Sequence, residues 1–463
     1  MQTRIEKDSL GERKIPADAY YGIQTDRALE NFPISGLKPK PSYVEATVYI
    51  KKAAARVNKG LGLLDSAKAD AIAAACDEVL NGRLQEWFVV DVYQAGAGTS
   101  HNMNANEVIA NRAIELLGGK KGEYSIIHPN DHVNMAQSTN DVCPTAIRIS
   151  AVLQSELLFR SLEQAETAFS EKAKEFDDIV KSGRTHLQDA VPIRLGQEFG
   201  AYATCIRKHS EAVRAAADLN RELGIGGTAV GTGINAHPKY RPMIVQELSN
   251  ELGTHFRMAE DYFEAMQSLR PFVQLSGAIR SLAQDLIRIA NDLRLLSSGP
   301  KTGLAEISLP GLQPGSSIMP GKVNPVMAEM LDMVCFQVIG CDTTVLLAAQ
   351  AGQLELNVMM PVVAYNLLHE IEILANALDV FSRLCVAGIK ADAGRCRDYA
   401  EASMSIVTVL NPHIGYAAAA EIAKESLASG KPIRQIVLDK GLLGEEQLNG
   451  IFELRGMTEP GNK

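Results

Sequence analysis

Four segments of this 463-residue sequence concentrate Gly, Ser, Thr, Asn and His between stretches of apolar residues at helical spacing. They are residues 96–106, 132–140, 183–189 and 315–325. Three of the four directly precede a predicted helix, where free backbone N–H groups and the positive end of the helix dipole favour anions. Together the segments predict a pocket that binds carboxylates.

The last segment combines groups that could react. Two glycines flank a pair of serines, and a lysine and an asparagine follow: Gly315, Ser316, Ser317, Gly321, Lys322 and Asn324. A flexible backbone, a hydroxyl that could act as nucleophile or base, and a cation therefore lie close together in the chain. This combination is typical of a mobile lid that carries reactive groups.

Each segment taken alone has a simpler interpretation as a helix cap or a turn. Residues 315–322 differ from a phosphate-binding loop in spacing, and Val323 stands where Ser or Thr is needed. Residues 224–229 resemble a dinucleotide fingerprint, but a helical pattern precedes them, which predicts a turn that ends a helix. His128 and His132 lack a helix face and nearby Cys or Glu ligands, so no metal site is predicted.

Composition argues against several classes of partner. The net charge is −9, and no Lys/Arg-rich block suits nucleic acid or an anionic membrane. Residues 1–16 are charged throughout, unlike a signal peptide, and no stretch approaches the ~18 apolar residues of a membrane span. Seven cysteines without a CxxC pair predict reduced thiols. We expect a soluble, cytoplasmic protein.

Long helical patterns dominate the middle of the chain. They cover residues 144–182, 195–223, 258–296, 326–349 and 356–386. Pro271 and Pro361 lie inside two of these runs and should kink or break them. The pattern predicts a mainly α fold, a bundle with five long helices per subunit, in which alanine-rich faces allow other subunits to approach closely.

Three domains are expected from these patterns. Residues 1–140 form an N-terminal domain of shorter helices and loops, in which residues 46–57 and 67–80 are predicted helices. Residues 141–388 form the central helical bundle, and residues 389–463 form a small C-terminal domain.

Residues 315–325, Gly-Ser-Ser-Ile-Met-Pro-Gly-Lys-Val-Asn-Pro, are similar to the signature loop of the aspartase/fumarase superfamily. The resemblance extends to residues 98–111, 137–141 and 183–189 and covers nearly the whole chain. It implies a homotetramer with a twenty-helix core, in which loops of three subunits build each active site. It also implies a small dicarboxylate substrate and no metal or organic cofactor.

Within the superfamily, a few positions distinguish the branches. Thr139, Ser100 and Gln313 resemble the aspartase branch, whereas Gln350 and Met360 stand where that branch often has Glu. The resemblance therefore implies an ammonia-lyase that converts L-aspartate reversibly to fumarate and ammonia through an aci-carboxylate intermediate. The alternatives are a fumarase that hydrates fumarate and a non-catalytic, crystallin-like relative, against which the intact loop argues.

The resemblance also implies a role for each site residue. Ser316 would be the general base, acting as an oxyanion because a neutral hydroxyl is too weak a base. The other assignments are as follows: Thr99, Ser138, Thr139 and Ser317 donate to the aci-carboxylate; Thr185, Lys322 and Asn324 hold the α-carboxylate; Asn140 and His186 face the ammonium group; Glu329 orients His186.

Overall fold

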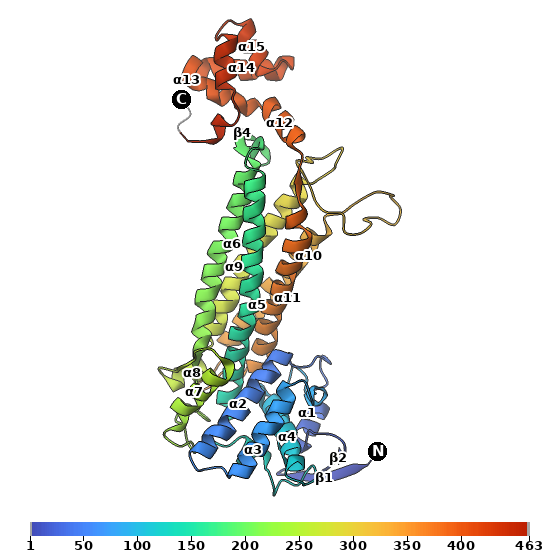
Figure 1. Cartoon of the computed structure of the whole chain (residues 1–463), viewed down its shortest axis with the longest axis vertical. Coiled ribbons are helices and arrows are strands. Elements are labelled where there is room, and N and C mark those ends of the chain that lie inside the picture. Colours follow the sequence, from blue (N-terminus) through green and yellow to red (C-terminus); the bar gives the residue numbers. More distant parts are fainter. Residues whose placement is uncertain (1, 461–463) are drawn as a thin grey trace. The chain divides into compact units, whose positions relative to one another are not determined.

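The computed structural model describes residues 2–460, and its fold is mainly α (Figure 1). The helices are α1 Ile23–Asn31, α2 Pro41–Gly60, α3 Ser66–Leu80, α4 Thr99–Leu116, α5 Thr139–Glu175, α6 Leu195–Asp218, α7 Tyr240–Leu252, α8 Tyr262–Gln267, α9 Arg270–Leu296, α10 Val326–Gln350, α11 Met360–Leu384, α12 Ala393–Ala402, α13 Asn411–Ile414, α14 Tyr416–Ser429, α15 Ile433–Asp439 and α16 Glu445–Ile451. The mainly α prediction with long helices is confirmed.

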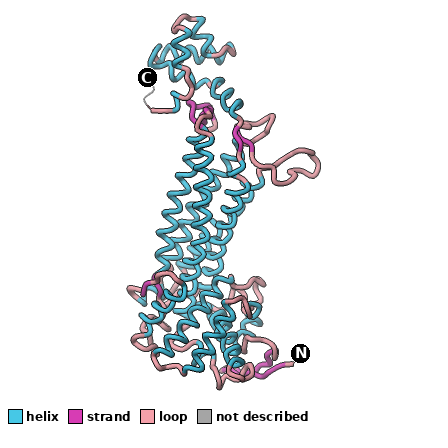
Figure 2. The backbone as a smooth tube through the Cα atoms, in the orientation of Figure 1, coloured by secondary structure: helices cyan, strands magenta, loops and turns pink. Residues whose placement is uncertain are grey.

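Strands occur only as short pairs among residues 2–460 (Figure 2). The antiparallel pairs are β1 Thr3–Asp8 with β2 Gly11–Pro16, β3 Val180–Thr185 with β4 Gln188–Arg194, and β7 Ile307–Ser308 with β8 Lys390–Ala391. The parallel pair is β5 Glu222–Leu223 with β6 Arg257–Met258. Because β5 directly precedes residues 224–229, that turn follows a strand, and not a helix as predicted.

The chain divides into two compact units. The first comprises residues 1–159, 211–283 and 336–375, and the second comprises residues 160–210, 284–335 and 376–463. The five long helices α5, α6, α9, α10 and α11 each contribute residues to both units. The division into three domains at residues 140 and 388 stays a prediction.

The long helices match the predicted runs with two instructive differences. Helix α5 ends at Glu175 instead of continuing to residue 182, because the chain turns into β3. The run predicted for residues 258–296 is broken into α8 and α9, with Pro271 as the second residue of α9. Pro361 likewise is the second residue of α11. A proline in the first turn leaves no intrahelical hydrogen bond unmade, so both helices begin there.

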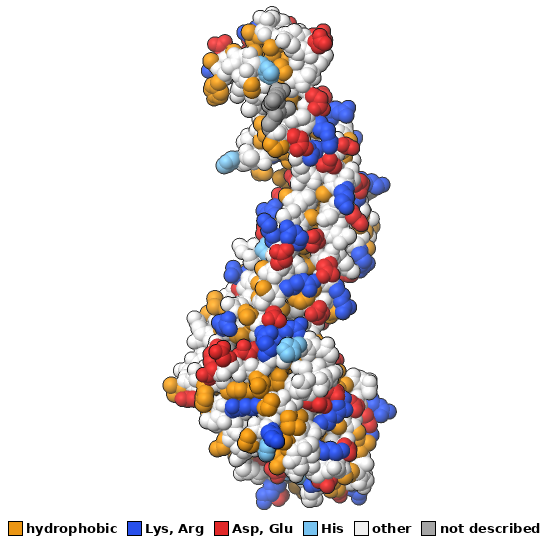
Figure 3. All heavy atoms as spheres, turned by 60° about the vertical axis from the view of Figure 1, so that its left-hand side comes forward, with side chains coloured by type: hydrophobic (Ala, Val, Ile, Leu, Met, Phe, Trp, Pro, Cys, Tyr) orange, Lys and Arg blue, Asp and Glu red, His pale blue; other side chains and the backbone are white. Residues whose placement is uncertain are grey.

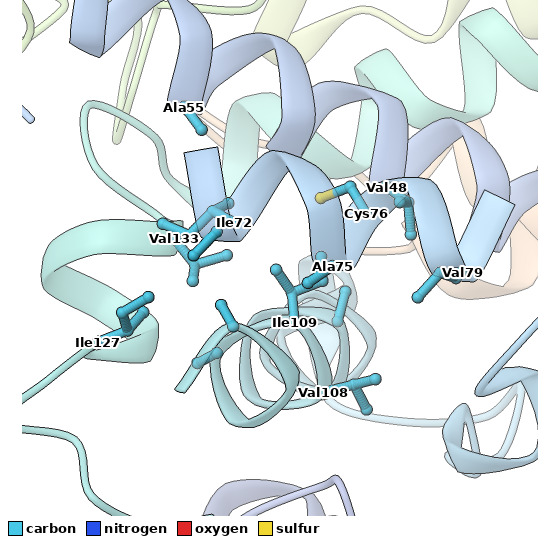
Figure 4. Packing of buried hydrophobic residues seen from close by; sticks show 14 of the residues in the cluster. Val48, Ala55, Ile72, Ala75, Cys76, Val79, Val108, Ile109, Ile127 and Val133 are labelled. Carbon is cyan, nitrogen blue, oxygen red and sulfur yellow. The ribbon is translucent and has the colours of Figure 1, made fainter. Parts of the chain in front are cut away.

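In the first unit, α2, α3 and α4 pack around a core of small and β-branched side chains. Figure 4 shows Val48 of α2, Ile72 and Val79 of α3, and Ile109 of α4 as members of one packed cluster. Ile72, Val79 and Ile109 are fully buried. This packing holds α4, whose first residue is the predicted site residue Thr99.

In the second unit, aromatic side chains join three of the long helices. Phe169 of α5 lies 5.9 Å from Phe199 of α6 and 6.4 Å from Phe381 of α11, measured between ring centroids. Phe176, the residue after α5, meets Phe199 edge to face at 5.2 Å. These contacts fix the ends of α5 and α6, between which the β3–β4 hairpin is inserted.

Two helices, α5 and α10, are long and apolar enough to cross a membrane by length and composition alone. No such segment was expected from the sequence. In α5 the apolar stretch is 78% buried within the chain, as in the core helix of a globular protein, whereas in α10 it is only 39% buried. On the face in Figure 3, Lys and Arg side chains are interspersed with Asp and Glu.

Glu370 on α11 is a fully buried carboxyl whose two oxygens have no hydrogen-bond partner among residues 2–460. Burial raises its pKa well above the usual range, since the low-dielectric core disfavours the charged form. The folded-state pKa therefore exceeds the unfolded value. The stability that this group contributes is complete at low pH and is lost as the pH rises through the folded pKa.

Glu370→Gln is therefore expected to raise the free energy of unfolding at mildly alkaline pH, by an amount on the order of 1–3 kcal/mol, and to flatten its decline with pH. Urea unfolding at mildly acidic and mildly alkaline pH measures both effects. The control is Glu171→Gln, at an exposed position of α5. A variant with the wild-type pH dependence would show that Glu370 does not titrate in the core.

Candidate active site

The N-terminus of α4 presents Thr99 at the surface of the first unit. Gly98 precedes it with φ +92°, and a Cβ at Gly98 would lie only 2.7 Å from the sulfur of Cys143 on α5. Both the conformation and the close approach require glycine here. The Gly98–Thr99 step thus brings the start of α4 against α5 and leaves the Thr99 side chain exposed.

The N-terminus of α5 carries three predicted site residues in succession. Ser138 Oγ accepts the N–H of Asn140 at 3.2 Å, and the Ser138 N–H donates to Asp141 Oδ1 at 2.9 Å. The other Asp141 oxygen accepts the N–H groups of Gly226 and Thr228. Ser138 is thus a helix cap, the simpler interpretation of this segment, and the cap fixes the position of the neighbouring Thr139.

A buried polar network joins the two helix starts. Asn102 Nδ2 of α4 donates to Thr139 Oγ1 at 3.2 Å. Lys51 Nζ of α2 donates to Asn102 Oδ1 at 2.7 Å, and also to the side-chain oxygens of Asn134 and Gln137. Burial lowers the pKa of Lys51 to about 7. Since Thr139 Oγ1 already accepts a hydrogen bond, its hydroxyl proton is directed elsewhere and can serve a ligand.

The segment 183–189 forms a β-hairpin, which the sequence pattern did not predict. Thr185 pairs with Gln188, so His186 and Leu187 form a two-residue turn, with φ of 56° and 58°. Such turns favour Asn and Gly, because other residues resist positive φ at about 1–2 kcal/mol each. His186 is exposed at the tip of the hairpin, so in this chain it is not a buried structural histidine.

A buried ion-pair network anchors this hairpin. Glu306 is fully buried and accepts from Arg184 Nη1 at 2.9 Å with both carboxylate oxygens. Lys181 Nζ, also buried, lies 3.2 Å from Glu306 Oε2 and 3.2 Å from Glu198 Oε2. The base of the hairpin that carries Thr185 and His186 is therefore held by charges in the interior.

Leu187→Gly is expected to stabilise the chain by up to about 1 kcal/mol and to leave turnover unchanged, because glycine adopts positive φ without strain. The midpoint of urea unfolding and the steady-state turnover number provide the two readouts. Leu187→Ala, which keeps the strain, should give no such gain. A loss of stability in the glycine variant would mean that the exposed Leu187 side chain makes a contact that outweighs the strain.

The segment 315–325 is a loop closed at its base. The Gly315 N–H donates to the Lys322 carbonyl at 2.8 Å, and Asn324 Nδ2 donates to the Gly315 carbonyl at 2.7 Å. Inside the loop, Ser316 Oγ accepts the N–H of Ile318 at 3.2 Å and of Met319 at 2.9 Å. Two backbone donors directed at one hydroxyl oxygen favour its ionised form.

The remaining residues of this loop region differ in exposure. Ser317 and Lys322 are exposed, whereas Asn324 is half-buried, with one amide hydrogen already engaged by Gly315. Glu329 lies in the first turn of α10. Within residues 2–460, no hydrogen bond or ion pair joins Glu329 to His186. The predicted orienting role of Glu329 therefore does not arise within one chain.

The predicted site residues fall into two groups. The first unit holds Thr99, Ser138, Thr139 and Asn140, and the second unit holds Thr185, His186, Ser316, Ser317, Lys322, Asn324 and Glu329. Within the first group, the structure brings the starts of α4 and α5 together through Asn102. Among residues 2–460, none of the predicted site residues belongs to a cluster of metal-ligand side chains.

Lys51 and Glu306 are supporting residues that the sequence did not single out as part of a site. In the sequence, Lys51 is one lysine among others in a predicted helix. No sequence pattern indicated that Glu306 lies between two cations, Lys181 and Arg184.

Residues 11–340 match the lyase family. The chain belongs to this family. Its residues 406–459 also match the fumarase C C-terminus. The lyase match spans both the α4–α5 starts and the Ser316 loop, so the two groups of site residues lie within the matched residues.

Several relatives, and solved structures of other proteins, resemble this lyase over nearly its full length. Aspartate ammonia-lyase of Bacillus subtilis (strain 168) is 49% identical, over 99% of this chain and 96% of its own. The structure of fumarate lyase:delta crystallin from Brucella melitensis bound to cobalt is 50% identical, with a TM-score of 0.96 over 99% of this chain and all of its own. The class II fumarase of Schistosoma mansoni is 38% identical, with a TM-score of 0.97 over the whole of both chains. The predicted resemblance to the aspartase/fumarase superfamily, and to its ammonia-lyases, is confirmed.

Proposed function

We propose that this lyase removes ammonia from L-aspartate to give fumarate, and catalyses the reverse addition. The observation that carries the proposal is the closed loop in which two backbone N–H groups point at Ser316 Oγ. The 49% identity to an aspartate ammonia-lyase over nearly the whole chain supports this substrate and leaving group. The proposed reaction uses side chains and backbone groups alone. We propose that the protein acts in the cytoplasm.

Ser316 is the proposed general base. As an alkoxide it takes the C3 proton of L-aspartate, and the electron pair left behind is delocalised into the β-carboxylate as an aci-carboxylate. The pair then forms the C2–C3 double bond as the C2–N bond breaks and neutral ammonia leaves. The N–H groups of Ile318 and Met319 stabilise the alkoxide and so lower the pKa of the Ser316 hydroxyl, as this step requires.

The aci-carboxylate needs hydrogen-bond donors that are already in place. Thr139 is the best-defined donor, because Asn102 occupies its acceptor side and Lys51 fixes Asn102. Thr99, Ser138 and Ser317 complete the proposed set. Each donor of this kind typically contributes ~2.7–4 kcal/mol to stabilisation of the developing charge.

The remaining polar residues hold the other two ends of the substrate. Lys322 supplies the cation for the α-carboxylate, with Thr185 and Asn324 as hydrogen-bond donors. Asn140 and His186 face the ammonium group, where the hairpin tip exposes His186. Glu329 orients His186 from a neighbouring subunit, since the two do not meet within one chain.

We further propose that the active sites are shared between subunits of a homotetramer. Support comes from α10, whose apolar side chains Met333, Phe336, Leu346 and Leu347 are exposed in the single chain. An exposed apolar face of this length is typical of a surface that other subunits cover. Copies of this chain are the proposed occupant.

Subunit mixing tests the shared site. Thr139→Val and Ser316→Ala alter different groups of site residues, and each variant alone is expected to lose turnover by at least about 10²-fold. Co-expressed, they should form mixed tetramers in which some sites carry neither substitution, so that activity reappears. Light scattering checks the tetramer. Activity that never returns, with mixed tetramers shown by mass spectrometry, would mean that one chain supplies both residues.

The reverse reaction, in which ammonia or water adds to fumarate, tests the function itself. Proton NMR of fumarate with the protein should show L-aspartate when ammonium is present and no L-malate when it is absent. L-malate alone would assign the chain to hydration, as in the Schistosoma mansoni relative. No product in either case would favour a non-catalytic role.

A further inference from the structure

Away from the predicted active site, three side chains of different ligand type meet between α6 and α9 in the second unit. Cys205 and His209 lie four residues apart on α6, and so share one face of that helix. Asp285 of α9 lies opposite them, with Oδ2 2.7 Å from His209 Nε2. One sulfur, one imidazole nitrogen and one carboxylate oxygen from these residues all lie within 4.8 Å of one another.

We propose that Cys205, His209 and Asp285 bind a late first-row divalent metal ion, for which zinc is the best fit. Zinc takes thiolate, imidazole and carboxylate ligands at roughly 2.0–2.3 Å, so ligand atoms this close need only small side-chain movements to surround it. Calcium and magnesium prefer oxygen ligands throughout, which this cluster does not offer. Three protein ligands leave the fourth tetrahedral position to water.

The accessibility of the cluster suits an ion that enters from solvent. All seven cysteines of the chain are free, and six of them are buried, whereas Cys205 is only half-buried. The side chains of His209 and Asp285 are 16% and 37% exposed. An ion can therefore reach Cys205, while the other six thiols are buried.

The charges around the cluster are compatible with a dication. The thiol binds as a thiolate and releases its proton to solvent, so thiolate and carboxylate together balance two positive charges. Arg288 is a cation beside the cluster, with Nε 3.2 Å from Asp285 Oδ1 and Nη1 3.4 Å from Asp292 Oδ2. It thus holds the outer oxygen of Asp285 and leaves Oδ2 directed at His209.

A bound ion would link α6 to α9 near the middle of both helices. Because the unfolded chain does not hold the three ligands together, binding to the folded state raises the unfolding temperature. The site has no residue in common with the proposed lyase chemistry, so its test is independent of that activity.

Cobalt titration of chelator-treated, untagged protein tests the site, with Co²⁺ as a coloured substitute for zinc. We expect one ion per chain, with tetrahedral visible absorption and a thiolate-to-cobalt charge-transfer band in the near ultraviolet. Cys205→Ser should abolish the band, and His209→Gln and Asp285→Asn should each weaken binding by at least about tenfold. Cys385→Ser, which removes a buried thiol elsewhere in the second unit, should keep the band.

The unfolding temperature in the presence of zinc provides a second measurement if a variant folds poorly. Zinc is expected to raise the unfolding temperature of the wild-type protein and of Cys385→Ser, and to displace the cobalt band from both. Absence of a charge-transfer band in the wild-type protein would overturn the proposal. So would a band that survives Cys205→Ser, because the ion would then lie elsewhere.

Discussion

Replacing Ser316 with alanine is expected to lower turnover by at least about 10²-fold while leaving the fold and the oligomer intact, because it removes the proposed base for the C3 proton. The Ser316 side chain is only half-buried in a surface loop, so its loss should change stability little. Steady-state kinetics of L-aspartate deamination give the turnover number and KM. A fall confined to turnover indicates a group that acts in the transition state.

The matched control is Ser308→Ala, at an exposed position of β7 a few residues before the loop. It should keep wild-type kinetics. Because Ser316 Oγ also accepts two N–H groups of its own loop, a purely structural role would instead raise KM as the loop loses its shape. Near-normal turnover in Ser316→Ala would remove this residue from the mechanism.

Glu306→Gln is expected to lower the free energy of unfolding by about 3–5 kcal/mol, because it leaves the buried Lys181 and the neighbouring Arg184 without their shared carboxylate. The same change should lower turnover, since the network anchors the hairpin that carries His186. Urea unfolding measures the first effect, and deamination kinetics measure the second.

Asp379→Asn provides the control for Glu306, because Asp379 forms an exposed i, i+4 pair with Arg383. Surface pairs contribute little, so this variant should remain close to the wild type in stability and activity. If Glu306→Gln changed stability and turnover as little as Asp379→Asn, the buried charges would be compensated in another way. The hairpin would then not depend on Glu306.

The sequence predicted those features that depend on local patterns. Apolar residues at helical spacing located α6, α10 and α11 to within a few residues, and the polar run before α5 contains a true helix cap at Ser138. The glycines at 315 and 321 indicated a loop, and residues 315–322 do close into one. In these cases the determining interactions lie within a few positions along the chain.

Interactions between residues far apart in the chain could not be predicted from the sequence pattern. Ile179 and Val180 continued the helical spacing of α5, but the pairing of Val180 with Arg194 places them at the start of a hairpin. Lys51 reaches Asn102 of α4 and Asn134 in the segment before α5, both far from it in the chain. Charge pairs and amide networks of this kind have no periodic signature, so only the folded chain shows which lysine is buried.

The most direct test of the proposed function follows the ultraviolet absorbance of fumarate after purified protein is mixed with L-aspartate or with L-malate. The ammonia-lyase proposal predicts fumarate from L-aspartate alone, at a rate that falls at least about 10²-fold in Ser316→Ala. Fumarate from L-malate alone would contradict it and make the chain a fumarase, and an equal rate in Ser316→Ala would contradict the assignment of the base.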